Sequence, residues 1–128
     1  MKEFAASEWR RAERSLATAA LLVSTDPESS ASRAYYAVFH AASALFALRR
    51  QTFTKHTALR AAVHKDLVKT GEWAVELGKD FDNVLFLRDT GDYGSLERLT
   101  NADAEQAVDA AKRILAACQN SQPELKTL

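Results

Sequence analysis

Apolar residues recur at helical spacing along most of the chain, and no segment shows the strict alternation typical of a half-buried strand. Thr70-Gly71 and the segment from Ser24 to Glu28 carry helix-ending and helix-capping residues. We therefore expect an all-α protein, an up-and-down bundle of four to five helices that forms a single domain over residues 1–128, with a polar, frayed tail from Gln119. The predicted helices cover residues 3–23, 29–50, 58–69, 72–87 and 101–118.

The segment from Ser32 to Phe46 is apolar on nearly every side, as a helix buried in a bundle is. Arg33, Tyr36 and His40 nevertheless share one stripe of it, because helical positions at these spacings lie within roughly 60° of one another. The apolar pattern predicts that these groups are buried, and buried polar groups need polar partners. The stripe either holds helices together as a structural network or faces a cleft for a phosphate or nucleotide. Tyr35 points off the stripe and is predicted to pack or to lie at an interface.

Lys55 and His56 lie in the connector before the third predicted helix. One interpretation is a solvated loop. The other is a contact with a phosphate group, since the positive end of the helix that follows favours an anion.

The segment Arg88-Asp-Thr-Gly-Asp-Tyr93 is dense in polar groups, and its glycine predicts a break or loop after the fourth helix. Asp89 and Asp92 could form an ion-paired cap with Arg88. Alternatively, Arg88 stabilises negative charge on a phosphodiester.

The overall composition excludes several classes of protein. Seventeen basic and seventeen acidic residues cancel, which argues against broad electrostatic binding of nucleic acid but leaves room for a small basic cleft. Cys118 is the single cysteine, and the three histidines show no metal-ligand spacing. Motifs such as the P-loop and the Rossmann fingerprint are absent, so we expect neither a metal nor a cofactor. The start of the chain lacks a signal-peptide pattern and no apolar run is long enough to span a membrane, so we expect a cytoplasmic protein.

Three segments together resemble the HEPN domains, the "higher eukaryotes and prokaryotes nucleotide-binding" family, and most closely its small stand-alone prokaryotic branch. They are Ser32-Arg-Ala-Tyr-Tyr-Ala-Val-Phe-His-Ala-Ala42, Lys55-His56 with Val68-Lys-Thr-Gly71, and Arg88-Asp-Thr-Gly-Asp-Tyr93. The resemblance implies a helical bundle that forms a homodimer and binds a nucleotide or RNA. It also implies a partner nucleotidyltransferase encoded alongside, in a toxin–antitoxin or defence setting.

Many HEPN proteins are metal-independent RNases in which an arginine, followed a few residues later by a histidine, lies at a cleft between two protomers. Arg88 matches that arginine, but the window from 93 to 95 begins with Tyr93 and contains no histidine. Tyrosine, with a pKa of about 10, is a poor general base at neutral pH. His40 or His56 could replace the missing group only if the fold brings it near Arg88. In related members with this Arg and Tyr, the transferase adenylylates the tyrosine, which makes Tyr93 the candidate for modification.

Three functions remain open. The favoured one is a partner protein that binds a nucleotide or RNA. The second is an RNase toxin with an altered site, with Arg88 and Tyr93 as its candidate catalytic residues. The third is a helical dimerisation module whose polar stripe is purely structural. The candidate binding residues for the first function are Arg33, Tyr36, His40, Lys55, His56, Arg88 and Asp92.

Overall fold

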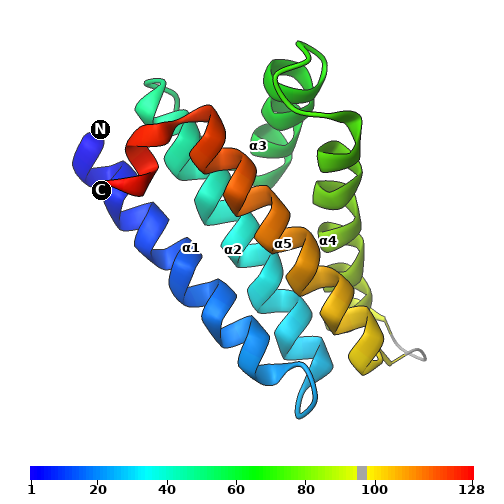
Figure 1. Ribbon diagram of the computed structural model, residues 1–128. Coiled ribbons are helices and arrows are strands. Elements are labelled where there is room, and N and C mark those ends of the chain that lie inside the picture. The colour runs from blue at the N-terminus through cyan, green and yellow to red at the C-terminus, as the bar shows by residue number, and fades with distance from the viewer. Residues whose placement is uncertain (95–97) are drawn as a thin grey trace.

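The computed structural model describes residues 1–94 and 98–128, and its long helices lie side by side as a bundle (Figure 1). The two chain ends lie at the same end of this bundle. No strand occurs in the described residues, and the predicted all-α bundle is confirmed. In chain order the elements are α1 (Lys2–Leu22), α2 (Pro27–Leu48), α3 (His56–Ala62), the π-helix η1 (Val63–Val68), α4 (Val75–Tyr93), α5 (Asn101–Ser121) and the 3₁₀-helix η2 (Pro123–Lys126).

The turn between α1 and α2 is fixed by short-range hydrogen bonds. The carboxylate of Asp26 accepts a hydrogen bond from the backbone N–H of Ser29, and Pro27 occupies the first helical position, where no N–H is needed. One turn further on, the buried hydroxyl of Ser30 donates to the carbonyl of Ala19 at 2.7 Å. This contact joins the start of α2 to the end of α1.

Helix α2 lies in the centre of the bundle and contacts α1, α4 and α5. Alanine is frequent on its buried faces, and a methyl group lets neighbouring helix backbones approach closely. The large apolar side chains of the core, such as Leu45 and Phe46 of α2 with Phe81 of α4 and Ile114 of α5, fill the remaining space. The fully buried alanines of α2 are Ala31, Ala34, Ala37, Ala41, Ala42, Ala44 and Ala47.

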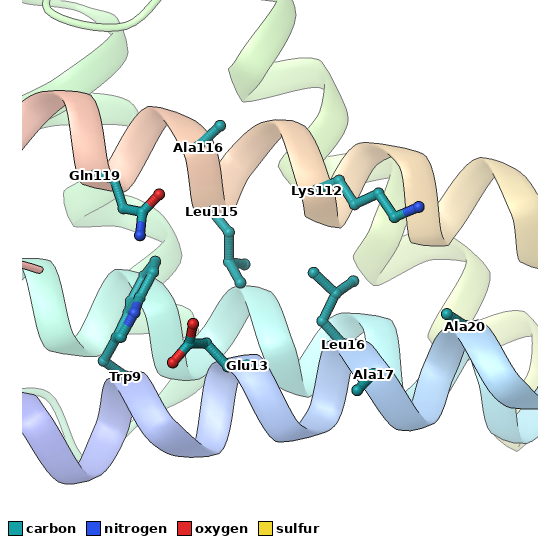
Figure 2. A pocket seen from close by; sticks show the side chains of 9 residues that line it. All are labelled: Trp9, Glu13, Leu16, Ala17, Ala20, Lys112, Leu115, Ala116 and Gln119. Atoms are coloured by element: carbon teal, nitrogen blue, oxygen red, sulfur yellow. The ribbon is translucent and has the colours of Figure 1, made fainter. Parts of the chain in front are cut away.

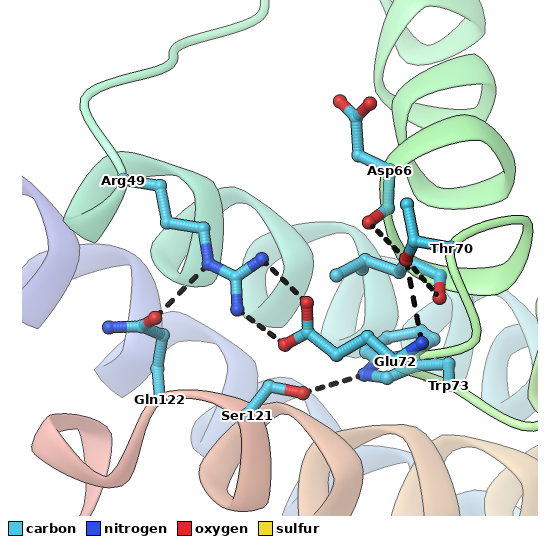
Figure 3. A network of polar contacts seen from close by, with 8 residues as sticks. Arg49, Asp66, Thr70, Glu72, Trp73, Ser121 and Gln122 are labelled. Carbon is cyan, nitrogen blue, oxygen red and sulfur yellow. Dashed lines mark hydrogen bonds and ion pairs between the residues drawn. The ribbon is translucent and has the colours of Figure 1, made fainter.

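A polar network ties together the end of the bundle away from the α1–α2 turn (Figure 3). Arg49, just after α2, donates both terminal nitrogens to the carboxylate of Glu72 and its Nε to Gln122 at 3.1 Å. The indole of Trp73 donates to the hydroxyl of Ser121 at 2.9 Å. These bonds fix the segment before α4 against the ends of α2 and α5.

The structure differs from the predicted boundaries at α4. The sequence predicts a helix over 72–87 followed by a break, whereas α4 continues to Tyr93. Gly91 does not end the helix because it packs closely in it: a Cβ there would lie 3.1 Å from Leu99 and 3.4 Å from Glu28. The glycine therefore serves close approach rather than a turn. As a result, the segment from Arg88 to Tyr93 is helical.

Two smaller differences concern the third helix and the tail. The predicted helix over 58–69 is divided into α3 and the π-helix η1. The tail expected to fray from Gln119 instead continues α5 to Ser121 and then forms η2, where Leu125 is buried against the core. The tail is polar in overall composition, but burial of this one leucine stabilises its attachment to the bundle.

Candidate functional site

The last turns of α4 place Arg88 against the side of α2 that carries two tyrosines. The Cζ atom of Arg88 lies 5.2 Å from the ring centre of Tyr35, 5.7 Å from that of Tyr36 and 5.5 Å from that of Tyr93. Only 16% of the Arg88 side chain is exposed. Contacts of this kind hold a guanidinium by the negative faces of the rings, without using its N–H donors.

The polar contacts of Arg88 are long. Its terminal nitrogens lie 3.3 Å from a carboxylate oxygen of Asp89 and 3.4 Å from the hydroxyl of Tyr36. Its Nε lies 3.1 Å from a carboxylate oxygen of Asp92, but off the direction of the N–H bond, so this buried nitrogen has no hydrogen-bond partner among the described residues. None of these contacts is the short two-bond fork of a fully paired arginine. Burial by itself would lower the pKa of Arg88, but the phenols and carboxylates around it raise that pKa above its usual value, so the positive charge persists.

A cavity of about 230 Å³ opens beside Arg88 between α2, α3 and α4, and Tyr35, His56 and Arg60 also line it. A hydrogen bond of 2.7 Å joins the Tyr35 hydroxyl to Nδ1 of His56, and the His56 ring stacks on Phe39 at a centroid distance of 4.2 Å.

The two bonded groups are both neutral at pH 7. Burial, assisted by the charge of Arg88 and by His40, lowers the pKa of His56 below its usual 6.5. Burial also raises the pKa of Tyr35 to about 12, so the phenol keeps its proton. The site therefore places an uncharged imidazole beside a permanent cation.

His40, one helical turn beyond Tyr36, is held from the neighbouring helix. Its Nδ1 is within hydrogen-bond distance of the Glu8 carboxylate of α1, and the two side chains are only 17% and 11% exposed. The His40 ring centre lies 6.3 Å from that of Tyr36. A carboxylate this buried persists only with a polar partner, so the pair links α1 to the α2 surface that faces the site.

The remaining predicted residues lie at the margin of the site. Arg33 is exposed, so the prediction that it is buried is wrong: its Cζ lies 4.8 Å from the Tyr36 ring, which covers one side of the guanidinium while the other stays in water. Lys55 is exposed and caps α3 through its backbone only. Tyr93 is 71% exposed, and it ends α4 instead of lying in the predicted loop.

Sequence reasoning missed three residues of this region. Tyr35 was assigned to packing, and its ring is indeed buried, but its hydroxyl bonds His56. Glu8 and Arg60 were not singled out, because nothing in a single sequence shows which helix faces will meet. A buried acidic residue on the apolar side of α1, next to Trp9, was the one available hint for Glu8.

A second cavity, of about 410 Å³, lies between α1 and α5 (Figure 2). Trp9 and Leu16 face Leu115 across it, with Glu13 and Lys112 at its edges. None of the site residues predicted from the sequence lines it, and it shares no lining residue with the Arg88 cavity.

Over residues 1–94 and 98–128, no group of three or more histidine, cysteine, aspartate or glutamate side chains is placed to hold a metal ion. In the same part of the chain, no helix is both long and apolar enough to cross a membrane.

Comparison with known proteins decides the family. Residues 6–121 match the HEPN domain. The chain belongs to the HEPN family. This HEPN domain is also 35% identical over 127 residues to a UPF0332 protein of Thermotoga maritima, an alignment that covers 98% of this chain and 96% of that protein. The resemblance drawn from the three sequence segments is thus confirmed. At the level of the family, membership supports a function related to nucleotides or RNA, and HEPN domains often dimerise.

The Glu8–His40 pair yields a stability prediction. We expect His40→Ala to lower the free energy of unfolding by about 3 kcal/mol, because it leaves a buried carboxylate without a partner. The double change Glu8→Leu with His40→Leu should recover most of this loss. Urea denaturation followed by circular dichroism at pH 7 measures both.

His64→Ala is the matched control for this prediction. His64 also pairs with a carboxylate, Asp82, but that partner is 40% exposed, so we expect a loss of no more than about 1 kcal/mol. Equal losses for the two histidine variants would contradict the role given to burial.

Proposed function

We propose that this HEPN domain binds RNA or a nucleotide by clasping a phosphate group with Arg88. The observation that supports the proposal best is the state of that arginine: charged, largely buried, held by aromatic rings, and without a short carboxylate fork, at the wall of a cavity. An arginine fork matches the geometry of a phosphate. The rings of Tyr36 and Tyr93 beside it offer surfaces on which a base can stack.

The other predicted residues extend this proposed surface. Arg33 lies beside the Tyr36 ring, and Lys55 directly precedes His56. Both side chains are exposed cations, so they are suited to phosphates that lie outside the cavity. His40 offers a polar contact next to Tyr36. Asp92 tunes the site by partial neutralisation of Arg88. Because the net charge of the chain is zero, binding depends on these few groups rather than on a broad basic face.

The affinity for RNA tests this proposal. We expect Arg88→Ala to weaken binding of a labelled single-stranded oligoribonucleotide at least tenfold, because a charge-assisted bond to phosphate contributes roughly 1.5–3 kcal/mol. Arg88→Lys, which keeps the charge without the fork, should lose less. Fluorescence anisotropy measures the affinities, and calorimetry repeats the comparison with nucleoside triphosphates.

Arg113→Ala is the control. Arg113 forms a short two-bond fork with Asp80 on the surface and does not line the cavity, so its loss should leave the affinity unchanged. Wild-type affinity in the Arg88→Ala variant, or no binding by the wild-type protein, would refute the proposal.

A second candidate function is metal-independent cleavage of RNA, and the position of His56 favours it. The sequence lacks a histidine after Arg88, but His56 of α3 lines the same cavity and is uncharged at neutral pH. In the tautomer whose Nδ1–H donates to Tyr35, the Nε2 atom of His56 can accept a proton. It would take the proton of the ribose 2′ hydroxyl while that oxygen attacks phosphorus. The bond from phosphorus to the 5′ oxygen then breaks, and the leaving oxygen takes a proton from water. Arg88 stabilises the charge on the phosphate.

Incubation of RNA with the protein in the presence of a chelator tests this second function. Cleavage should be lost in Arg88→Ala and in His56→Gln, and should leave a 2′,3′-cyclic phosphate end. Because the pKa of His56 is lowered, the wild-type rate should fall only below about pH 6.5 as the base becomes protonated. If the RNA stays intact with the wild-type protein and both variants, the cleavage function is refuted and only the proposed binding function stands.

The exposed side of α4 is the surface through which we propose that the protein forms a homodimer. Phe86 is 65% and Tyr93 71% exposed, and these positions, seven residues apart, share one face of the helix. Arg88 faces α2 from the other side of the helix, and Tyr93, whose ring centre lies 5.5 Å from the Cζ atom of Arg88, would connect such an interface to the site.

We expect Phe86→Glu to shift the protein from dimer to monomer, because the charge cannot be buried in the contact. Sedimentation velocity at several concentrations measures this. Leu21→Glu changes an exposed apolar residue of α1 and serves as the control, because it should leave the dimer unchanged. A wild-type protein that stays monomeric throughout would contradict the proposed dimer.

The proposal also includes a partner nucleotidyltransferase and a toxin–antitoxin or defence role in the cytoplasm, all of which rest on the family resemblance. The exposure of the Tyr93 ring at the end of α4 supports its assignment as the residue that such a transferase would adenylylate. The mass of the protein co-expressed with the transferase, compared with that of Tyr93→Phe, decides whether this position is modified.

A further inference from the structure

Arg60 is a second arginine of the Arg88 cavity, and it comes from a different helix. It lies in the last turn of α3, and its Nε donates to the carboxylate of Asp82 on α4 at 2.8 Å. That bond anchors the guanidinium at one edge. Among the described residues, no hydrogen bond engages its two terminal nitrogens, which leaves them available to a ligand in the cavity that Arg60 lines.

The anchor itself is held from two sides. His64 lies 2.9 Å from the same carboxylate oxygen of Asp82 that Arg60 contacts. Burial alone would raise the pKa of Asp82, but its bonds to Arg60 and His64 hold that pKa below the usual value, so the carboxylate stays charged at neutral pH. A charged, doubly bonded anchor restricts the orientations of Arg60, which reduces the entropy lost when it binds a ligand.

The two arginines are held from different levels of α4, Arg60 through its bond to Asp82 and Arg88 through its own place in the helix. Asp82 and Arg88 are six residues apart on α4, which corresponds to about 9 Å along the helix axis. Asp82 tethers Arg60 near one of these levels, and the tyrosine rings hold Arg88 at the other. A single phosphate group would therefore accept hydrogen bonds mainly from one of the two arginines, whereas a ligand with two separate phosphate groups can contact both. Asp89 at the rim is the carboxylate that opposes them, which leaves the lining with one net positive charge.

We propose that Arg60 is the specificity-determining residue that makes this cavity a site for two successive phosphates of an RNA backbone rather than for one isolated phosphate. The inference rests on the proposed binding at Arg88 and deepens it by naming the ligand class. Asp82 acts as the positioning residue of Arg60.

Two small probes separate the classes: a nucleoside 5′-monophosphate and the corresponding nucleoside 3′,5′-bisphosphate, measured by calorimetry. The wild-type protein should bind the bisphosphate roughly fivefold more tightly, in keeping with a partly exposed charge contact. Arg60→Ala should remove this preference while leaving the affinity for the monophosphate unchanged. Asp82→Asn should reduce the preference in the same direction.

Arg113→Ala and Asp80→Asn are matched controls, because this pair is also an arginine whose Nε donates to an aspartate of α4, at 2.8 Å, but away from the cavity. Both should keep the wild-type preference. The salt dependence of oligoribonucleotide binding gives a second readout that a structural role would not change. Its log–log slope should decrease by about 0.7 in Arg60→Ala, the contribution of one phosphate contact on a single strand.

The outcomes separate this inference from the proposed function. A bisphosphate preference that survives in Arg60→Ala, or no preference in the wild-type protein, overturns the role of Arg60 while binding at Arg88 stands. If the wild-type protein binds neither probe, or if Arg88→Ala binds both as tightly as the wild type does, the proposed function fails and the inference fails with it.

Discussion

The enclosure of α2 by α1, α4 and α5 is the constraint on which the rest of this structure depends. A helix covered on several sides can keep polar side chains only where a neighbouring helix supplies a partner, because an unpaired polar group in the interior costs free energy. Two polar residues of α2 meet this requirement through different neighbours. His40 has the carboxylate of Glu8, and the hydroxyl of Tyr35 has His56. The alanines between them allow the close helix packing that brings these partners within reach.

Arg88 is largely buried but departs from this pattern of full pairing, and that is why it attracts a functional interpretation. Arg49 and Arg113 each make a two-bond fork with a carboxylate, whereas Arg88 is surrounded by rings and long contacts. A buried cation whose Nε has no hydrogen-bond partner lowers the stability of the fold. Such a residue is a reasonable candidate for ligand contact, because an anion supplies the missing hydrogen bonds. The chain belongs to the HEPN family, and this membership supports a function related to nucleotides or RNA. A phosphate group as that anion agrees with such a function.

The helices were predictable because burial alone sets their periodicity, and the two segments singled out from the sequence both contribute residues to one cavity. The errors occurred where a residue type has two uses. Glycine favours turns, so Gly91 predicted a break, but in the bundle it allows close contact with Leu99. Tyrosine has an apolar ring and a polar hydroxyl, so Tyr35 was correctly expected to pack while its bond to His56 was missed. Arg33 seemed buried because the apolar pattern around it is strong, yet its long side chain reaches water.

The sequence by itself determined the all-α class, the approximate helices and the family, and it singled out Arg88 as a candidate, since these depend on local periodicity and on residue types in fixed order. Only the tertiary structure decided which groups meet there. It brought His56 and Arg60 of α3 to the cavity of Arg88, and it formed the Glu8–His40 pair between α1 and α2. The reason is physical: contacts between helices depend on their relative rotation and spacing, which the packing of the whole core sets and no single segment encodes.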